Sequence, residues 1–303
     1  MKILFNYFIF PGFLFAAFVG LISGWVDRKV TARLQWRKGP PWYQNFVDIV
    51  KLLGKETILP QGSGLTFLLS PYLGLLSLIL ATTILGMGIL APKTSFTGDL
   101  IVVLYLLIIP AISLIIGASS SRNPLASVGA SREMKLVLGY ELPFILSIIV
   151  VIIKSSGMIQ IGEIITRQVS SNSNLMSFSG AIAFIVAILC MQAKLCLVPF
   201  DASEAEQELM AGTLIEYSGL PLAIFKLTKA VLLYTMPLFL IILFWAGDLR
   251  PVILIDKYIA LLVIIILIKN TNPRVRIDQA LRFFWGPVTA LAAMAVILAV
   301  VGL

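Results

Sequence analysis

The acidic residues of this sequence are concentrated in one short segment. Five of the fifteen carboxylates fall within residues 199–217, in the run Pro-Phe-Asp-Ala-Ser-Glu-Ala-Glu-Gln-Glu and a later Glu-Tyr pair. They are Asp201, Glu204, Glu206, Glu208 and Glu216. A carboxylate at the centre of a bilayer costs roughly 2.5–3.5 kcal/mol, so acids beside apolar segments need a water-filled cavity, a cation or a proton. The pattern indicates proton handling.

The spacing of these acids suggests that they act together. If residues 201–217 form a helix, steps of about 100° place four of the acids on one face and Glu206 on the other. The four are Asp201, Glu204, Glu208 and Glu216. Like charges that close cannot all ionise, so we expect a coupled set that titrates near neutral pH. Gly212 weakens the case for one continuous helix, and a solvated cytoplasmic loop is the alternative.

A further acid, Glu141, lies inside a predicted membrane helix. It comes about seven residues after the expected start of that helix, and Pro143 removes a nearby backbone hydrogen bond, which permits distortion or entry of water. An acid at such a position usually faces a polar cavity. Its candidate partners are Lys194, Lys226 and Lys229, although each lysine could instead extend to the membrane interface. We expect Glu141 and these lysines to share a proton relay with the acidic segment.

The elements that must hold these residues are transmembrane helices. Hydrophobic residues make up 59% of the chain and charged residues 13%, with a mean hydropathy of +1.00, whereas soluble proteins carry about 25% charged residues. Uncharged runs recur at roughly the 20 residues that span a bilayer, and they are apolar on all sides, unlike barrel strands. We therefore predict an all-α polytopic membrane protein with a single domain, residues 1–303. Its eight transmembrane helices are expected at 4–26, 67–91, 99–117, 134–153, 177–197, 219–245, 253–269 and 285–303.

Residues suited to metals or haem are scarce. The chain contains no histidine, which excludes bis-His haem ligation and a histidine relay. Its two cysteines, Cys190 and Cys196, lie on different faces of one predicted helix and offer no ligand set for zinc or an iron–sulfur cluster. We expect no metal or cofactor in this chain. The run after Met1 and Lys2 has no cleavage-site pattern and is expected to remain as the first helix.

Lysine and arginine are distributed unevenly over the loops. The loops after the first, third, fifth and seventh predicted helices hold most of them. The opposite side offers only Lys2, Lys93, Lys154, Arg167, Arg250 and Lys257. By the positive-inside rule the basic loops face the cytoplasm, and both termini lie outside. The loop of residues 198–218 is then an acidic cytoplasmic loop.

The first cytoplasmic loop, residues 27–66, joins a basic stretch to a predicted amphipathic helix. Apolar residues recur at helical spacing after the rigid Pro-Pro element at 40–41, and polar residues occupy the other face. The apolar positions are Trp42, Phe46, Ile49, Val50 and Leu53. Such a helix lies along the membrane surface. It is either a spacer that rests on lipid or part of a binding surface.

Four segments, in order, resemble one known family. They are residues 27–40 with 51–56, residues 132–143, residues 199–217 and residues 274–285. The first begins Asp-Arg-Lys and ends Arg-Lys-Gly-Pro, the second contains Tyr-Glu-Leu-Pro, the third is the acidic segment, and the fourth begins Arg-Val-Arg-Ile-Asp-Gln. Together they resemble subunit 1 of respiratory complex I, also called its H subunit, and the relatives of that subunit in membrane-bound nickel–iron (NiFe) hydrogenases.

Within that family the chain is similar to the group 4 hydrogenase branch, represented by the M subunit of archaeal membrane-bound hydrogenases. Quinone-reducing subunits typically read Gly-Pro-Asn after the basic stretch, whereas this chain reads Gly-Pro-Pro at residues 39–41. The resemblance implies a non-catalytic anchor and ion-coupling subunit in a prokaryotic plasma membrane, which links a cytoplasmic redox arm to antiporter-like, ion-translocating subunits. The alternatives are a quinone-site subunit of complex I type and the equivalent subunit of a sulfane-sulfur reductase complex.

The resemblance also implies which partners carry cofactors. A NiFe centre and iron–sulfur clusters are expected in hydrogenase-like large and small subunits and an iron–sulfur subunit; lipid is a further partner, and no nucleic acid is expected. The redox arm is expected to dock on the basic loops and their neighbours, for which contact with anionic lipid is the alternative role. The docking residues are Arg28, Lys29, Arg33, Arg37, Lys38, Trp42, Arg274, Arg276 and Asp278.

Two other functional classes fit the sequence less well. A stand-alone transporter needs broken helices in two matching halves, and the sequence shows no convincing internal repeat. A purely structural anchor needs no buried acid, so Glu141 and the acidic segment argue against it.

Overall fold

The computed structural model describes residues 2–204, 208 and 210–302, and the regular elements within these residues are helical. The long helices are α2 (Phe13–Leu34), α4 (Leu65–Leu90), α5 (Asp99–Ser120), α6 (Pro124–Lys154), α8 (Phe178–Lys194), α10 (Gly219–Phe244) and α11 (Pro251–Thr271). The shorter ones are α1 (Lys2–Phe8), α3 (Gln44–Leu53), α7 (Ile161–Ser170), α12 (Ile277–Phe283), a π-helical turn η4 (Phe284–Val288) and α13 (Thr289–Val301). Single 3-10 turns, η1 (Pro92–Thr94), η2 (Asn174–Met176) and η3 (Gly212–Leu214), lie in the loops.

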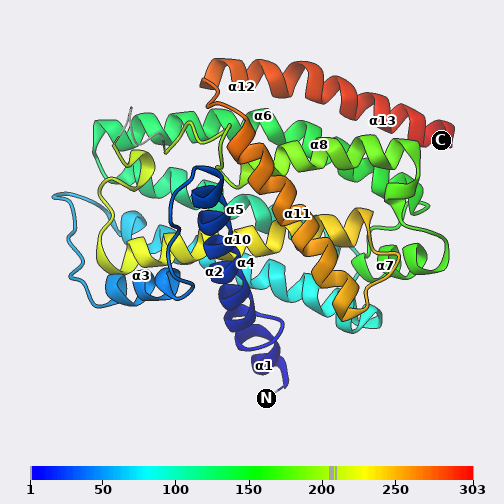
Figure 1. Cartoon of the computed structure of the whole chain (residues 1–303), viewed down its shortest axis with the longest axis horizontal. Coiled ribbons are helices and arrows are strands. Elements are labelled where there is room, and N and C mark those ends of the chain that lie inside the picture. The colour runs from blue at the N-terminus through cyan, green and yellow to red at the C-terminus, as the bar shows by residue number, and fades with distance from the viewer. Residues whose placement is uncertain (1, 205–207, 209, 303) are drawn as a thin grey trace.

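The bundle has the composition and length of a membrane domain. Seven of the described helical segments are long and apolar enough to cross a membrane, and α8 is a shorter apolar helix of 17 residues. These eight correspond to the eight predicted helices, so the expected all-α polytopic fold is confirmed. The long helices α4, α5, α6, α8 and α10 run side by side, while α2 and α11 cross in front of them (Figure 1). Helix α10 is buried along nearly its whole length and forms the centre.

The boundaries differ from the prediction in ways that matter for the site. Helix α6 begins at Pro124, ten residues before the expected start, because Asn123 caps it by accepting the N–H of Leu125 at 2.9 Å. Glu133 therefore lies inside the helix. The predicted first helix is interrupted between α1 and α2, and the last begins at Ile277 rather than 285. The amphipathic helix α7 was not predicted.

Helices α2 and α10 touch through their backbones. A Cβ atom at Gly20 would collide with the main-chain carbonyl of Ala230, so only glycine allows this approach. Helix α3 occupies the position of the predicted amphipathic helix and is attached to α2 nearby. The side-chain amide of Asn45 donates to the carbonyl of Leu21 at 2.9 Å. This crossing fixes where α2, α3 and α10 meet.

The loops expected to share one side of the membrane do lie together. Three hydrogen bonds connect them: Ile58 N–H to Ser218 Oγ at 2.9 Å, Asn123 Nδ2 to Glu216 Oε1 at 2.5 Å, and Val275 N–H to Pro199 O at 3.0 Å. At the opposite end Asp99 accepts the N–H of Ile161 at 2.8 Å, and Gln168 accepts that of Ala246 at 3.1 Å. The alternation of loops is thus present in the fold, and the cytoplasmic assignment of the basic end stays a prediction.

Tyr217 fastens the end of the acidic segment to the bundle. Its ring stacks on Phe67 with a centroid distance of 4.1 Å and an interplanar angle of 5°, and meets Phe225 edge-on at 4.8 Å. Its hydroxyl donates to the carbonyl of Phe67 at 3.1 Å and lies 3.1 Å from the hydroxyl of Ser70. Burial raises the pKa of Tyr217 to about 12, so the phenol stays neutral at physiological pH.

We expect Tyr217→Ala to lower the free energy of unfolding by about 3–5 kcal/mol, because it removes a buried aromatic ring and leaves a cavity. Tyr217→Phe keeps the stack and should cost only about 1 kcal/mol for the lost hydroxyl bonds. Thermal unfolding of the two variants in detergent measures the difference. Equal stability of the alanine variant and the wild type would contradict this role.

Candidate functional site

The first part of the site is a cavity of about 450 Å³ that we call the mouth cavity. It lies among α2, α3, α10 and the segment 195–204 that follows α8. Its charged lining residues are Asp27, Arg28, Asp48, Glu204, Lys226 and Lys229. Arg28 holds one wall in place, since its guanidinium donates to Asn45 at 2.7 Å and lies 3.4 Å from the carboxylate of Asp48. Charges of both signs therefore line one concave surface at the basic end of the bundle.

An ion pair lies on the opposite wall of the mouth cavity. The ammonium of Lys229, on α10, pairs with both carboxylate oxygens of Glu204. Lys229, one of the three lysines considered as partners for Glu141, thus pairs with Glu204 instead. Lys226 lies one turn earlier on α10, is exposed, and forms no ion pair with a described residue.

Behind this pair lies Glu133, a buried carboxyl group on α6. Its side chain is 1% exposed, and Oε1 accepts a hydrogen bond from the thiol of Cys196 at 3.3 Å. Oε2 has no hydrogen-bond partner among the described residues. A cavity of about 40 Å³, lined in part by Glu133, Cys196 and Lys229, has room for water at this position. Burial raises the pKa of the Cys196 thiol well above its usual value, and the nearby carboxyl of Glu133 adds to this shift. The thiol therefore stays protonated and remains a hydrogen-bond donor.

A second ion pair, which is more deeply buried, joins α6 to α8. The Lys194 ammonium donates to Glu141 Oε1 at 2.6 Å; the two side chains are 2% and 16% exposed. Lys194 Nζ also lies 4.6 Å from the ring centroid of Phe144 and 5.5 Å from that of Tyr140. Tyr140 follows Glu133 by seven residues and so lies on the same face of α6. The small cavity beside Glu133 is also lined by Lys194, which connects the two acids on α6.

Two further acids of the segment, Asp201 and Glu208, lie at the basic end. Asp201 pairs with Arg274 at 2.9 Å, and Glu208 pairs with Arg132 at 2.6 Å, beside a cavity of about 290 Å³. Burial raises the pKa of Asp201, although Arg274 opposes the shift. The hydrogen bond from Arg132 instead lowers the pKa of Glu208. The pKa values of the two carboxyls are thus shifted in opposite directions, upward by burial at Asp201 and downward by Arg132 at Glu208.

The single-helix hypothesis for residues 201–217 is not supported. Residues 201–204 and 210–217 of this segment form turns, bends and the short η3, with left-handed backbone at Met210 and Gly212. The acids turn to separate partners: Asp201 to Arg274, Glu204 to Lys229, Glu208 to Arg132 and Glu216 to Asn123. Glu206 lies outside the described residues. The described acids therefore do not share one face, and only Glu204 reaches the mouth cavity.

The proposed docking residues fall into two groups. Around α2, Arg28 lines the mouth cavity, and Lys29 Nζ donates to the carbonyl of Gly39 at 3.3 Å. Four neighbours in this group are exposed: Arg33, Arg37, Lys38 and Trp42. In the second group Arg274 pairs with Asp201, and Arg276 pairs with Asp278 at 3.3 Å. These arginines already have carboxylates within the chain, so the proposed docking cations that form no ion pair with a described residue are those near the end of α2.

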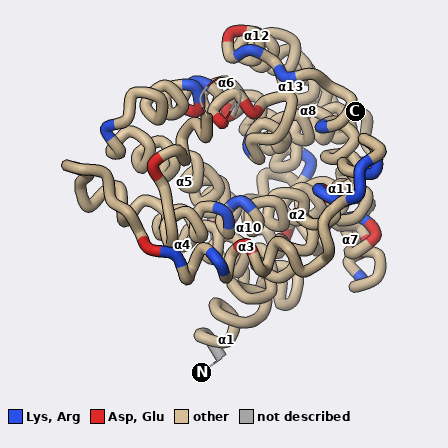
Figure 2. The backbone as a smooth tube through the Cα atoms, turned by 60° about the vertical axis from the view of Figure 1, so that its left-hand side comes forward, with Lys and Arg blue, Asp and Glu red and all other residues tan. Residues whose placement is uncertain are grey.

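Figure 2 shows that charged residues lie mainly on loops and helix ends, while most of the helical length is uncharged. Glu133, Cys196 and Tyr140 were not identified as functional from the sequence. The signal that could have found Glu133 is the Asn-Pro pair at 123–124, a helix start that places residue 133 inside α6. Cys196 was considered only as a possible metal ligand, because its hydrogen bond to Glu133 depends on the turn after α8.

Known proteins resemble this chain over nearly all of its length. A family model described as NADH dehydrogenase matches residues 8–300. The chain is 34% identical over 205 residues to Hydrogenase-4 component C of Escherichia coli strain K12. This match covers 66% of this chain and 63% of that protein, which is less than two thirds of its length. It is 29% identical over 306 residues to the H subunit of the NADH-quinone oxidoreductase of Bacillus cytotoxicus, covering 92% and 90% of the two chains.

A solved structure is also similar. A chain from the membrane-bound sulfane sulfur reductase, an archaeal respiratory membrane complex, superposes with a TM-score of 0.89 at 30% identity. The match covers 99% of this chain and 100% of the other. The arrangement of helices around the acids is therefore shared with a subunit of a respiratory complex.

We expect Glu141→Leu to lower the free energy of unfolding by about 3–5 kcal/mol, because it leaves the Lys194 ammonium buried without its carboxylate. Lys194→Met should cost less, because the Glu141 side chain is less deeply buried than that of Lys194, and the double variant should recover much of the loss. A double-mutant cycle on thermal unfolding in detergent measures the coupling. The exposed pair of Arg250 and Asp248 is the control and should couple weakly. Additive losses at Glu141 and Lys194 would show that their pairing contributes nothing.

Proposed function

This chain belongs to the NADH dehydrogenase family, as a membrane subunit of hydrogenase- and complex I-type complexes, and we propose that it relays protons between a cytoplasmic redox arm and ion-translocating membrane subunits. The observation that carries the proposal is the series of acids that leads from the mouth cavity into the bundle. Glu204 lies at the cavity, Glu133 behind it, and Glu141 eight residues further along α6.

Each acid in the series has a neighbour that can stabilise or exchange a proton. Lys229 pairs with Glu204, the Cys196 thiol donates to Glu133, and Lys194 pairs with Glu141. Lys229 lines both the mouth cavity and the small cavity beside Glu133, so it connects Glu204 to the buried acid. Water in the small cavity beside Glu133 would complete the connection towards Lys194. A series of this kind fits a relay better than a structural anchor, which needs no buried acid.

The partners follow from the same proposal. The redox arm would dock on the basic end, near Arg33 and Arg37, whose planar guanidinium groups suit pairing with carboxylates. The arm would carry the NiFe or equivalent centre and the iron–sulfur clusters, and antiporter-like subunits would contact the bundle within the membrane. The chain is a multi-pass protein of a prokaryotic membrane; we propose that the basic end faces the cytoplasm and that both termini lie outside.

The mouth cavity supports a second candidate function, a quinone site of complex I type. Its volume of about 450 Å³ lies within the range of small-molecule pockets. Leu21, Ile49 and Leu233 provide apolar lining opposite the charged residues, an arrangement that suits a polar headgroup with an apolar tail. The similarity to a subunit of an NADH-quinone oxidoreductase along nearly the whole chain favours the same function.

We expect Glu133→Gln and Glu141→Gln to lower the number of ions pumped per electron by roughly tenfold or more, because glutamine keeps the shape but cannot carry the proton. Redox chemistry by the detached soluble arm should be unchanged. The measurement is ion uptake by membrane vesicles that contain the intact complex. Glu163→Gln, at the opposite end of the bundle, is the control and should pump at the wild-type ratio. Wild-type ratios in both relay variants would support the structural anchor instead.

The two branches predict different responses to quinones. If the chain serves a hydrogenase- or sulfur-reductase-type complex, turnover with a soluble electron donor should continue in the presence of quinone-site inhibitors, because no headgroup enters the mouth cavity. Assays of the complex purified in mild detergent, together with its nickel content, decide the matter. Stoichiometric quinone reduction by that preparation would establish the complex I-type function.

A further inference from the structure

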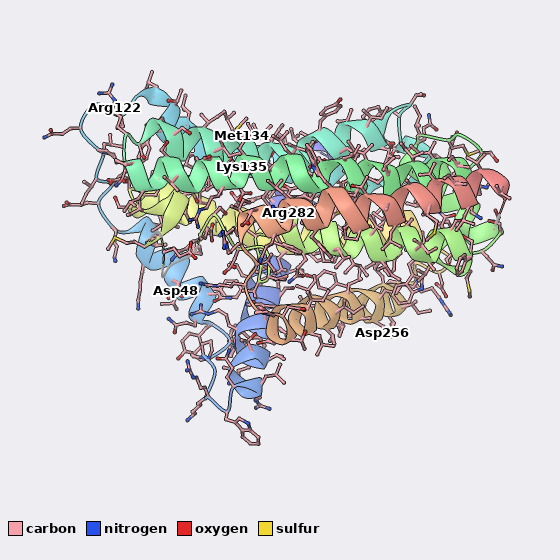
Figure 3. The ribbon with its side chains drawn as sticks, turned by 90° about the horizontal axis from the view of Figure 1, so that it is seen from above. Asp48, Arg122, Met134, Lys135, Asp256 and Arg282 are labelled. Atoms are coloured by element: carbon pink, nitrogen blue, oxygen red, sulfur yellow. The ribbon has the colours of Figure 1, made fainter. Side chains whose placement is uncertain are left out.

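The end of α2 presents an unusual side chain to solvent. Trp36 is 98% exposed, the highest value for any large apolar residue in the described part of the chain. It belongs to a short basic segment, residues 33–38, that we call the α2 tip. Figure 3 shows α2 and the loop that follows it extending away from the bundle, beyond α3 with its labelled Asp48. A bare indole in water loses the contacts that normally stabilise this side chain.

The backbone of the α2 tip is held in place although its tryptophan touches almost nothing. The N–H of Trp36 donates to Arg33 at 3.1 Å, and that of Arg37 donates to Ala32 at 2.7 Å. Further along, the indole of Trp25 donates to the carbonyl of Pro40 at 3.0 Å, which closes the loop onto α2. Trp36 itself adopts a left-handed conformation with φ 58°, which is rare for a bulky residue. The backbone that carries the ring is therefore already in place before any partner binds.

The surroundings of Trp36 are strongly positive. Arg33, Arg37 and Lys38 are exposed, and they form no ion pair with any residue that the structure describes. Tryptophan and arginine are enriched at hot spots, the few residues that contribute most of the binding energy of a protein interface. A partner surface that complements the α2 tip would have an apolar slot for the indole and carboxylates at the rim of that slot.

The height of the α2 tip favours a protein partner over lipid. Arg28 contacts Asn45 of α3, the helix expected to lie along the membrane surface. Leu34 follows Arg28 by six residues, a rise of about 9 Å along α2. The α2 tip therefore stands beyond the level of α3, where lipid headgroups give way to water and a soluble subunit can reach it.

We propose that Trp36 is the anchor with which this chain holds its redox arm, by inserting into an apolar slot rimmed by carboxylates on a cytoplasmic subunit. The proposal rests on the docking of that arm described above and names the residue on which it depends. The indole sets how long the arm stays bound, and the three cations accelerate its approach.

The test uses the intact complex purified in mild detergent. We expect Trp36→Ala to release the soluble subunits at least tenfold faster than the wild type, and Trp36→Phe to give an intermediate rate. Arg37→Glu should make release more sensitive to salt. Tyr105→Ala, which removes a 68% exposed aromatic ring from α5, is the matched control and should retain the arm. Each variant is compared at equal abundance in the membrane. Wild-type retention of the arm by Trp36→Ala would overturn the proposal.

A second measurement does not depend on how the alanine variant folds. The fluorescence of Trp36 is obtained as the difference between the wild type and Trp36→Phe, in the isolated subunit and in the complex. Protection from iodide on assembly supports the slot, whereas quenching by brominated lipid in the complex would show that Trp36 rests in the membrane and would overturn it. The relay is tested separately, because Glu133→Gln should keep the arm bound while ion pumping fails.

Discussion

A charge inside an apolar bundle needs a partner, a cavity or a proton, and this requirement organises the chain. The pairs that meet it join elements far apart in sequence. Glu141 and Lys194 connect α6 to α8, and Glu204 with Lys229 connects the segment after α8 to α10. Asp27 pairs with Lys269 at 2.7 Å and connects α2 to α11. Each pair fixes how two elements pack, so the positions of the helices and those of the titratable groups are determined together.

The order of the helices could be predicted from the sequence because apolar runs of spanning length are a local property. Glu141 stood out for the same reason, as an acid within such a run, and Lys194 was among its expected partners. The acidic segment behaved differently, because its partners, such as Arg274 for Asp201, come from loops that only the tertiary fold brings near. Glu133 was missed through an error of ten residues in the start of α6. The local signals were sufficient for the fold, and the site needed contacts between distant segments.

The mouth cavity lies between the proposed docking surface and the acids of the proposed relay. Arg28 and Asp48, on α2 and α3, form the wall that continues towards the α2 tip. Glu204 and Lys229 form the wall that leads to Glu133. An arm bound at the basic end would thus lie next to the acids of the proposed relay. No long path through the membrane is required between docking and the first proton transfer.

The backbone contact between Gly20 and Ala230 gives α2 a mechanical property. Sliding of α2 past α10 would bring side chains against backbone at that point, whereas a rotation of α2 about the contact would keep the two helices together there. Leu34 lies 14 residues further on, about 21 Å along the axis, while the mouth cavity adjoins the contact itself. A sideways movement of about 2 Å at the end of α2 therefore turns the helix by only about 5° at the fulcrum. Motion of an arm bound at the end of α2 would therefore reach the lining of the mouth cavity with a much smaller amplitude, as a fine adjustment of the space around the acids.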